Sequence, residues 1–261
     1  ELRRKDDLYK YGIVIEYNAD PVVKGRGSAI FFHVWRGENR PTAGCVSLSE
    51  QDMIGLLKLL NPARRPLAVI GTEDDIWPKD EALIDIRSIS PAVQVDMRYF
   101  RSDNFTGKKI YEANTCLLRA STARKLDAAQ RAFAAQGYGI KVWDCYRPLS
   151  AQKLFWEIFP DERYVANPAK GGSRHNRGAA VDLTLLDGKG RELAMPTAFD
   201  DFSERASRTY KKLPMKIIQN RKILEETMGQ AGFAPLPSEW WHFDDSEYER
   251  FAPADIPVGA H

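Results

Sequence analysis

Residues 173–186 have the sequence SRHNRGAAVDLTLL, a polar loop that runs into an apolar strand. AAVDLTLL at 179–186 predicts a buried strand, because it is short and almost entirely apolar. His175 lies in the loop, seven residues before Asp182 in the strand. Gly178 and the two alanines leave a tight backbone path between them. We therefore expect the loop histidine and the strand aspartate to be able to converge on one ion.

The segments around this stretch predict an α+β domain. IKVW at 140–143 has the β-branched and aromatic composition of a strand. Helices are expected at 121–136, 149–159 and 219–230. Strands and helices are mixed along the chain without regular β-α-β alternation. We therefore expect a central, mostly antiparallel sheet flanked by helices.

The first 72 residues predict a small β-rich segment. Strands are expected at 11–17, 28–34 and 66–71. Ser49 is a suitable cap for a helix over 50–60. The apolar stripe of that helix consists of Met53, Leu56, Leu57 and Leu60. A polar stretch with Pro78 predicts a linker at 73–82, and a second domain is expected to span 83–261.

Composition excludes several classes of protein. The chain has 261 residues, a net charge of +2 and 43% hydrophobic residues, which is typical of a globular protein and not of disorder or a coiled coil. It has no apolar run near the ~18 residues of a membrane span. It has no basic arm for nucleic acid, and no CxxC pair for a cysteine-type zinc finger. The oligomeric state stays open.

Histidine positions limit where a metal can bind. The chain has four histidines: His33, His175, His242 and His261. EWWH places Glu239 three residues before His242. A catalytic zinc site has three protein ligands and an open position, so His175, Asp182 and His242 are one candidate set, with Glu239 as the base for a water. The alternative is that the spacing is accidental and both histidines are hydrogen-bonded in a core.

Five motifs in this order resemble the D-alanyl-D-alanine dipeptidase family (VanX/DdpX type). They are VDMRYFRSDNFTG at 95–107, WDCYRP at 143–148, SRHNRGAAVDLTL at 173–185, PTAFDDFSERA at 196–206 and EWWHF at 239–243. The resemblance covers about 83–252 and implies one zinc ion, held by His175, Asp182 and His242. It also implies that Glu239 is the general base.

The same resemblance assigns four further residues. Arg147 is implied to stabilise the oxyanion, since a guanidinium presents a planar fork of donors. Tyr99 and Asp200 are implied to meet the substrate ammonium, and Ser173 to contact the dipeptide. Structural alternatives remain: an ion pair for Arg147, a helix cap for Asp200 or its neighbour Asp201, and ordinary hydrogen bonds for Ser173 and Tyr99. Trp240 and Trp241 are expected to be packing residues.

The N-terminal segment contains a second pair of reactive residues. His33 and Cys45 are twelve residues apart, and a base near a thiol favours the nucleophilic thiolate. The non-catalytic alternative is a small buried thiol beside a strand histidine. GRGSAIFFHV and PTAGCVSL within residues 1–71 resemble the C-terminal half of an L,D-transpeptidase (YkuD-type) domain. This implies Cys45 as nucleophile and His33 as base, in a module that is either active or an incomplete remnant.

Cysteine usage and compartment are linked. We expect Cys116 and Cys145 to be two buried free thiols, with a disulfide as the alternative in an exported protein. A transpeptidase-like module favours the periplasm or cell wall, although the dipeptidase resemblance also allows the cytoplasm.

The resulting hypothesis is a zinc-dependent hydrolase that cleaves D-Ala-D-Ala, fused to an L,D-transpeptidase-like module. One alternative is a zinc D,D-carboxypeptidase or endopeptidase that acts on peptidoglycan stem peptides. Another is an L,D-transpeptidase in which Cys45 carries the main activity. A third is an inactive wall-binding module.

Overall fold

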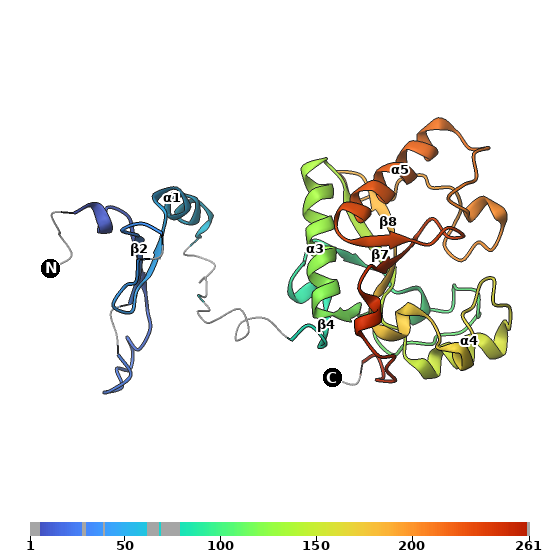
Figure 1. Cartoon of the computed structure of the whole chain (residues 1–261), viewed down its shortest axis with the longest axis horizontal. Helices are drawn as coiled ribbons and strands as arrows, with labels where there is room; N and C mark the ends of the chain where they lie inside the picture. Colours follow the sequence, from blue (N-terminus) through green and yellow to red (C-terminus); the bar gives the residue numbers. More distant parts are fainter. Residues whose placement is uncertain (1–5, 28–29, 39, 62–67, 69–78, 260–261) are drawn as a thin grey trace. The chain divides into compact units, whose positions relative to one another are not determined.

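The chain folds into two compact units, Glu1–Thr72 and Glu73–His261 (Figure 1). The computed structural model describes residues 6–27, 30–38, 40–61, 68 and 79–259. Most of the strand expected at 66–71 and of the linker expected at 73–82 lies outside these residues. No helix in the described part of the chain is long and apolar enough to span a bilayer.

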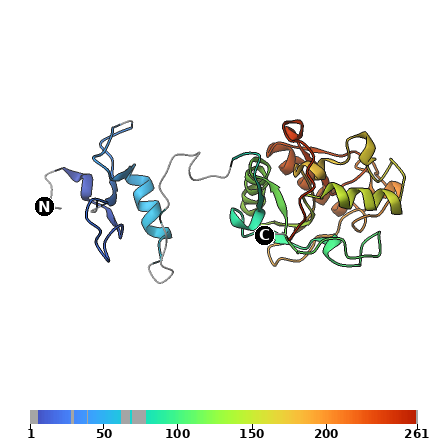
Figure 2. The same cartoon turned by 90° about the horizontal axis from the view of Figure 1, so that it is seen from below.

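In its described residues, the first unit has a three-stranded sheet and one α-helix. Its elements are η1 (Asp7–Tyr9), β1 (Gly12–Ile15), β2 (Ile30–Val34), β3 (Val46–Leu48) and α1 (Glu50–Leu59). β2 pairs with β1 antiparallel and with β3 parallel, and α1 packs against β2 (Figure 2). Ser49 caps α1 as predicted, accepting from the Asp52 amide at 3.0 Å. The apolar stripe is narrower than predicted, because Met53 is buried but Leu57 is exposed.

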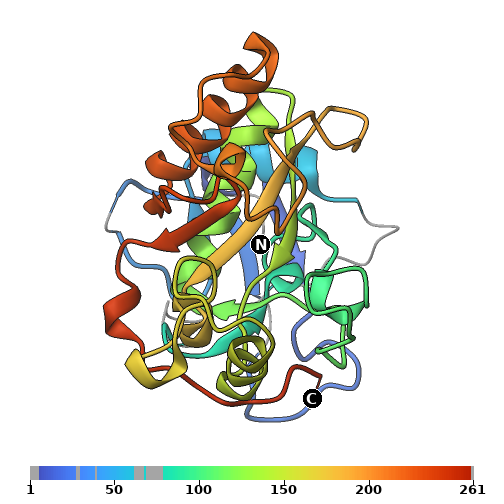
Figure 3. The same ribbon diagram turned by 90° about the vertical axis from the view of Figure 1, so that its right-hand side faces the viewer.

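The second unit is built on a five-stranded sheet in the order β5-β7-β8-β10-β9. The strands are β5 (Gln94–Val95), β7 (Gly139–Asp144), β8 (Ala180–Leu186), β9 (Phe233–Pro235) and β10 (His242–Asp245). Only the β5–β7 pair is parallel, so the expected mostly antiparallel sheet is confirmed. β8 lies between β7 and β10 (Figure 3). β4 (Leu83–Asp85) and β6 (Leu117–Arg119) form a separate two-stranded sheet.

Three helices flank the large sheet, as predicted. They are α3 (Ala120–Ala135), α4 (Leu149–Ile158) and α5 (Met215–Gln230). α3 and α5 pack together and against the sheet, while α4 lies on the opposite side from α3 (Figures 1 and 2). α5 begins four residues before the predicted start, directly after Pro214, because proline tolerates a helix N-terminus but not its interior.

The main core lies between α3 and the sheet. Leu126, Ala129 and Phe133 of α3 are fully buried and join one cluster with Val181 and Leu183 of β8. Since successive residues of a strand point to opposite faces, Asp182 and Thr184 face away from this core. The apolar face of β8 therefore fixes the strand, and the other face carries polar residues.

Cys116 and Cys145 form a disulfide, with their Cα atoms 5.3 Å apart. The expectation of two buried free thiols is therefore wrong. Cys116 directly precedes β6 and Cys145 directly follows β7. The backbone joins the two places, since the Tyr146 amide donates to the Leu117 carbonyl at 2.9 Å. A sequence separation of 29 residues gave no sign of this proximity.

Candidate active site

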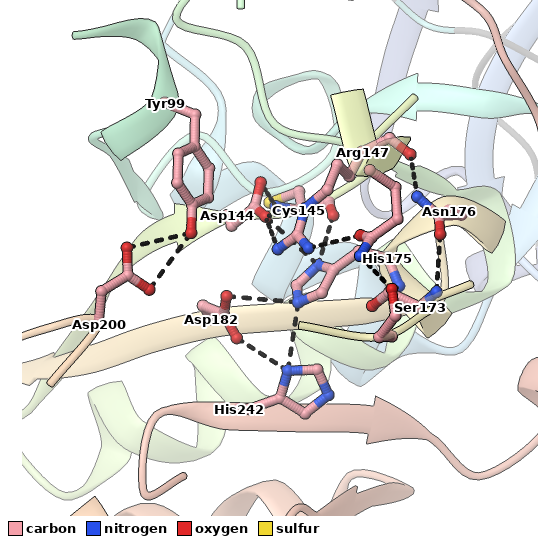
Figure 4. Close-up of polar contacts among 12 residues, drawn as sticks. Tyr99, Asp144, Cys145, Arg147, Ser173, His175, Asn176, Asp182, Asp200 and His242 are labelled. Atoms are coloured by element: carbon pink, nitrogen blue, oxygen red, sulfur yellow. Dashed lines mark hydrogen bonds and ion pairs between the residues drawn. The ribbon is translucent and has the colours of Figure 1, made fainter. Parts of the chain in front are cut away.

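Strand register brings two of the predicted ligands together. In the antiparallel β8–β10 pair, His242 lies directly opposite Asp182. Directly opposed residues point to the same face of a sheet. Asp144 of β7 lies opposite Asp182 on the other side of β8. The three polar residues thus form a row across the sheet, on the face that points away from α3 (Figure 4).

His175 reaches this row from a short 3-10 helix, η6 (Arg174–Arg177). Ser173 caps η6 by accepting from the His175 amide at 3.3 Å, and the Asn176 side chain accepts in return from the Ser173 amide at 2.7 Å. Gly178 ends the turn at φ 69°, where a Cβ would lie 2.6 Å from a Leu83 side-chain atom. Glycine at 178 is therefore required, and it sets the position of the histidine loop.

Hydrogen bonding orients the His175 ring. Its Nδ1 lies 2.6 Å from the carbonyl oxygen of Cys145. A carbonyl can only accept, so Nδ1 carries the proton and Nε2 presents a lone pair to the cluster.

The three predicted ligands converge with the spacing of a tetrahedral site. His175 Nε2 lies 3.2 Å from His242 Nδ1 and 3.3 Å from one oxygen of Asp182, whose other oxygen is 3.0 Å from His242 Nδ1. Bonds of about 2.0–2.2 Å to a tetrahedral ion place ligand atoms roughly 3.3 Å apart. The donor set therefore fits zinc.

The surroundings of His242 also favour a positive charge. Its Nε2 bonds to Asp244 at 2.8 Å, the carboxylate–histidine arrangement that fixes a ring at a metal site. Burial opposes a charge on the ring, but the hydrogen bonds to Asp182 and Asp244 raise the pKa of His242 to about 10. The pKa of Asp182 is low: burial raises it, but the interactions with His175 and His242 lower it further than burial raises it. The carboxylates of Asp182 and Asp244 thus place negative charge beside His242.

Glu239 lies beside the cluster without joining it. Its carboxylate is 4.0 Å from His242 Nδ1, and its side chain is 16% exposed. Burial raises the pKa of Glu239 above its ordinary value. A carboxyl group that is largely buried and readily protonated suits a group that accepts and later returns a proton.

Arg147 is both an ion-pair partner and a pocket residue. Its Nε and Nη2 donate to Asp144 at 3.1 and 2.7 Å, and its Nη1 donates to Gln152 at 2.8 Å. The ion pair considered from the sequence is therefore present. A guanidinium has five N–H donors. Three of these N–H groups are used here, so two remain for a ligand in the pocket.

Tyr99 and Asp200 contact each other at one end of the site (Figure 4). The Tyr99 hydroxyl donates to the two Asp200 oxygens at 3.2 and 3.0 Å. Burial raises the pKa of Asp200 well above its ordinary value. The neighbouring Asp201 accepts from the Ser203 amide at 2.8 Å. Neither aspartate caps the following 3-10 helix, η7 (Glu204–Ala206), whose N-cap position is Ser203.

All the candidate residues of the second unit line one pocket of about 260 Å³. They are Tyr99, Arg147, Ser173, His175, Asp182, Asp200, Glu239 and His242. Trp240 is buried packing, as predicted, whereas Trp241 also lines the pocket. The volume lies below the roughly 300–1,000 Å³ of sites for drug-sized molecules, so a small ligand is favoured.

His33 and Cys45 belong to the first unit. His33 is buried on β2, where its Nδ1 bonds to the Val34 carbonyl at 2.8 Å. Cys45 is half-buried, is not in a disulfide and directly precedes β3. The parallel β2–β3 register pairs Phe32 with Val46. Cys45 therefore lies next to the start of the strand that pairs with the strand of His33.

The sequence reasoning missed two orienting carboxylates. Asp144 accepts from Tyr111, from the Cys145 amide and from Arg147, and Asp244 holds His242. Asp244 shares a strand face with His242, but the sequence gave no sign of that strand. Asp144 could not be found without the β7–β8 register.

The comparisons with known proteins agree with this geometry. A family model described as D-ala-D-ala dipeptidase, peptidase family M15, matches residues 79–254.

The chain belongs to the D-Ala-D-Ala dipeptidase family.

Three curated D-alanyl-D-alanine dipeptidases match this chain. The Escherichia coli K12 protein is 36% identical over 162 residues, covering 62% of this chain and 83% of the relative. The Enterococcus faecalis V583 protein is 37% identical over 172 residues, covering 58% and 85%. The Streptomyces coelicolor protein is 31% identical over 184 residues, covering 63% and 90%. Peptidases of this family are zinc enzymes, as the ligand set here leads one to expect.

Proposed function

We propose that the second unit is a zinc-dependent dipeptidase that hydrolyses D-Ala-D-Ala to D-alanine. The observation that carries this is the convergence of His175, Asp182 and His242 beside a buried Glu239, in a pocket of about 260 Å³. Family membership supports the same activity.

The zinc ligands would be His175 Nε2, His242 Nδ1 and an Asp182 oxygen. A zinc ion there supplies Lewis acidity, polarising the scissile carbonyl and making water easier to deprotonate at neutral pH. In the first proton transfer, Glu239 accepts the proton of the attacking water. Glu239 then gives that proton to the leaving amine, which departs as the amino group of D-alanine.

Arg147 and the Tyr99–Asp200 pair orient the substrate. The two remaining N–H donors of Arg147 would donate to the carbonyl oxygen of the substrate and stabilise the negative charge that develops there. Asp200 is a buried carboxyl, and the α-ammonium of a free dipeptide supplies the positive charge that it lacks. An N-acylated peptide has no such charge and leaves Asp200 unpaired, which favours free dipeptides. Ser173 contributes by fixing the His175 loop and lines the dipeptide pocket.

Comparing two substrates tests this assignment. Zinc-loaded protein should hydrolyse free D-Ala-D-Ala, with little activity on an N-acylated stem peptide that ends in D-Ala-D-Ala. Cleavage of the stem peptide alone would instead identify a D,D-carboxypeptidase. No turnover of either substrate by zinc-loaded protein would favour the wall-binding role.

We also propose an L,D-transpeptidase-like role for the first unit, with Cys45 as nucleophile and His33 as base. The support is that His33 lies on β2 and Cys45 directly precedes the neighbouring strand β3. Alkylation of Cys45 should then abolish peptide transfer and leave dipeptide hydrolysis intact. Unchanged transfer after complete alkylation would rule out this role.

The Cys116–Cys145 disulfide supports a location in the periplasm or cell wall, because disulfides persist in oxidising compartments. Fractionation of cells that express the protein tests this.

A further inference from the structure

A second cavity, of about 420 Å³, lies beside the catalytic pocket in the second unit. Asp200 and Phe105 line both cavities. Thr184 lines the second cavity from β8, two residues beyond Asp182, so both side chains share one face of the strand. The second cavity therefore continues along the sheet face that carries the metal ligands, with Asp200 in the wall between the two.

Two buried donors on residues that line this cavity have no hydrogen-bond partner among the described residues. They are the indole Nε1 of Trp143, a residue only 3% exposed, and the Nε of Arg98. The guanidinium carbon of Arg98 lies 5.5 Å from the centre of the Trp143 ring, so both donors belong to one corner. By contrast, Trp240 lines the same cavity and donates its Nε1 to Thr197 at 2.9 Å. Buried donors are normally satisfied, so an unpartnered pair marks a place for an acceptor.

The acidic neighbours of Arg98 hold it loosely. Its Nε is 3.7 Å from Asp96, and its Nη1 is 3.4 Å from Asp103. Charged hydrogen bonds are normally about 2.7–2.9 Å long. Asp96 makes its short contact with Arg101 instead, at 2.8 Å. Arg98 therefore retains both charge and donors for a ligand.

The polar groups that line the cavity differ in depth. Trp143 and Thr184 are buried, whereas the acidic side chains at the rim are exposed: 58% for Asp103 and 38% for Glu192. Glu192 pairs with Lys141 at 2.9 Å, and one oxygen of Asp103 pairs with Arg101 at 2.9 Å. The second oxygen of Asp103, 3.4 Å from Arg98, is the more weakly held acidic group. A molecule with a negative end inward and a positive end outward complements this arrangement.

We propose that this cavity is a second binding site for a small zwitterionic amino acid. Its carboxylate accepts from Arg98 and Trp143, and its ammonium lies near Asp103 at the rim. The proposal rests on the proposed function only for the choice of ligand, since D-alanine is the product of the neighbouring reaction.

Indole N–H signals in a ¹H–¹⁵N spectrum of the zinc-loaded full chain test the proposal. The chain has six tryptophans, and the signals of Trp143 and Trp241 are assigned with Trp143→Phe and Trp241→Phe. Trp143 reports on the second cavity and Trp241 on the catalytic pocket. D-alanine should shift the Trp143 signal saturably. N-acetyl-D-alanine should act more weakly, and D-alaninamide, which has no carboxylate, should have no effect.

Arg98→Met should abolish the Trp143 shift, with Arg131→Met, at an exposed arginine of α3 that does not line the cavity, as the control that retains it. Arg98→Met should change the rate of D-Ala-D-Ala hydrolysis by no more than about threefold. If the unaltered protein does not hydrolyse D-Ala-D-Ala, the proposed function is refuted, whereas the second site is still judged by the Trp143 shift. Three outcomes would overturn the second site. They are no Trp143 shift at any D-alanine concentration, an equal shift by D-alaninamide, or a Trp143 shift that follows Trp241 at the same midpoint and survives Arg98→Met.

Discussion

Glu239→Gln tests the proton transfers in this site most sharply. Glutamine keeps the volume of the side chain and removes its ability to accept a proton. A general base contributes about 10²–10⁴-fold to the rate. The other carboxyl groups that line the pocket are engaged: Asp182 as a ligand, Asp200 with Tyr99, and Glu162 with Lys170 at 2.7 Å near the surface. Because none can replace Glu239, we expect the upper part of that range.

The expected loss in kcat is therefore about 10³–10⁴-fold, or roughly 4–5 kcal/mol of barrier. Release of D-alanine from D-Ala-D-Ala, measured at saturating substrate, gives kcat, and metal analysis gives the zinc content. Zinc content should not change, because Glu239 lies 4.0 Å from the nearest ligand nitrogen. Glu226→Gln, at an exposed α5 residue paired with Lys222, is the matched control and should turn over normally. A Glu239→Gln enzyme with full zinc and near-native kcat would refute this reasoning.

Further substitutions separate the roles of the other residues. Arg147→Lys should lower kcat by about 10²–10³-fold with a small change in KM, since a lysine cannot replace the fork at the oxyanion; an increase confined to KM would contradict that role. Asp200→Asn should reduce the preference for free dipeptide over N-acylated dipeptide, measured as the ratio of the two kcat/KM values, and an unchanged ratio would argue against the ammonium contact. Asp244→Asn should weaken zinc about 10–100-fold in a chelator competition, because Asp244 orients His242; wild-type affinity would show that this contact is dispensable. Replacing Cys116 and Cys145 together by serine should lower the free energy of unfolding by about 3–4 kcal/mol for a loop of this length, measured by denaturant unfolding, whereas an equal loss in protein already treated with reductant would disprove a disulfide effect.

Local patterns predicted the elements that carry most of the core. The apolar run at 179–186 became β8, and the apolar stripe of 121–136 became the buried face of α3. Gly137 ends that helix with φ 81°, as the sequence suggested. Such features depend on neighbours in the chain, so periodicity and caps are enough to find them.

Features that depend on pairing between distant segments were not predictable in this way. β10 is short and mostly polar, so HFDD gave no strand signal, although it holds His242 opposite Asp182. The Cys116–Cys145 disulfide depends on the ends of β6 and β7 lying side by side. Arg147 is held by Asp144, whose role depends on the β7–β8 register. The ligand residues were identifiable through the motifs that resemble the family, and their geometry required the fold.

The central claim is that one zinc ion binds to His175, Asp182 and His242. Anomalous diffraction collected at the zinc edge from crystals of the zinc-loaded protein tests it directly. We predict a single strong peak about 2.0–2.2 Å from His175 Nε2, His242 Nδ1 and an Asp182 oxygen. A peak at other residues, or no peak in fully loaded crystals, would contradict the claim.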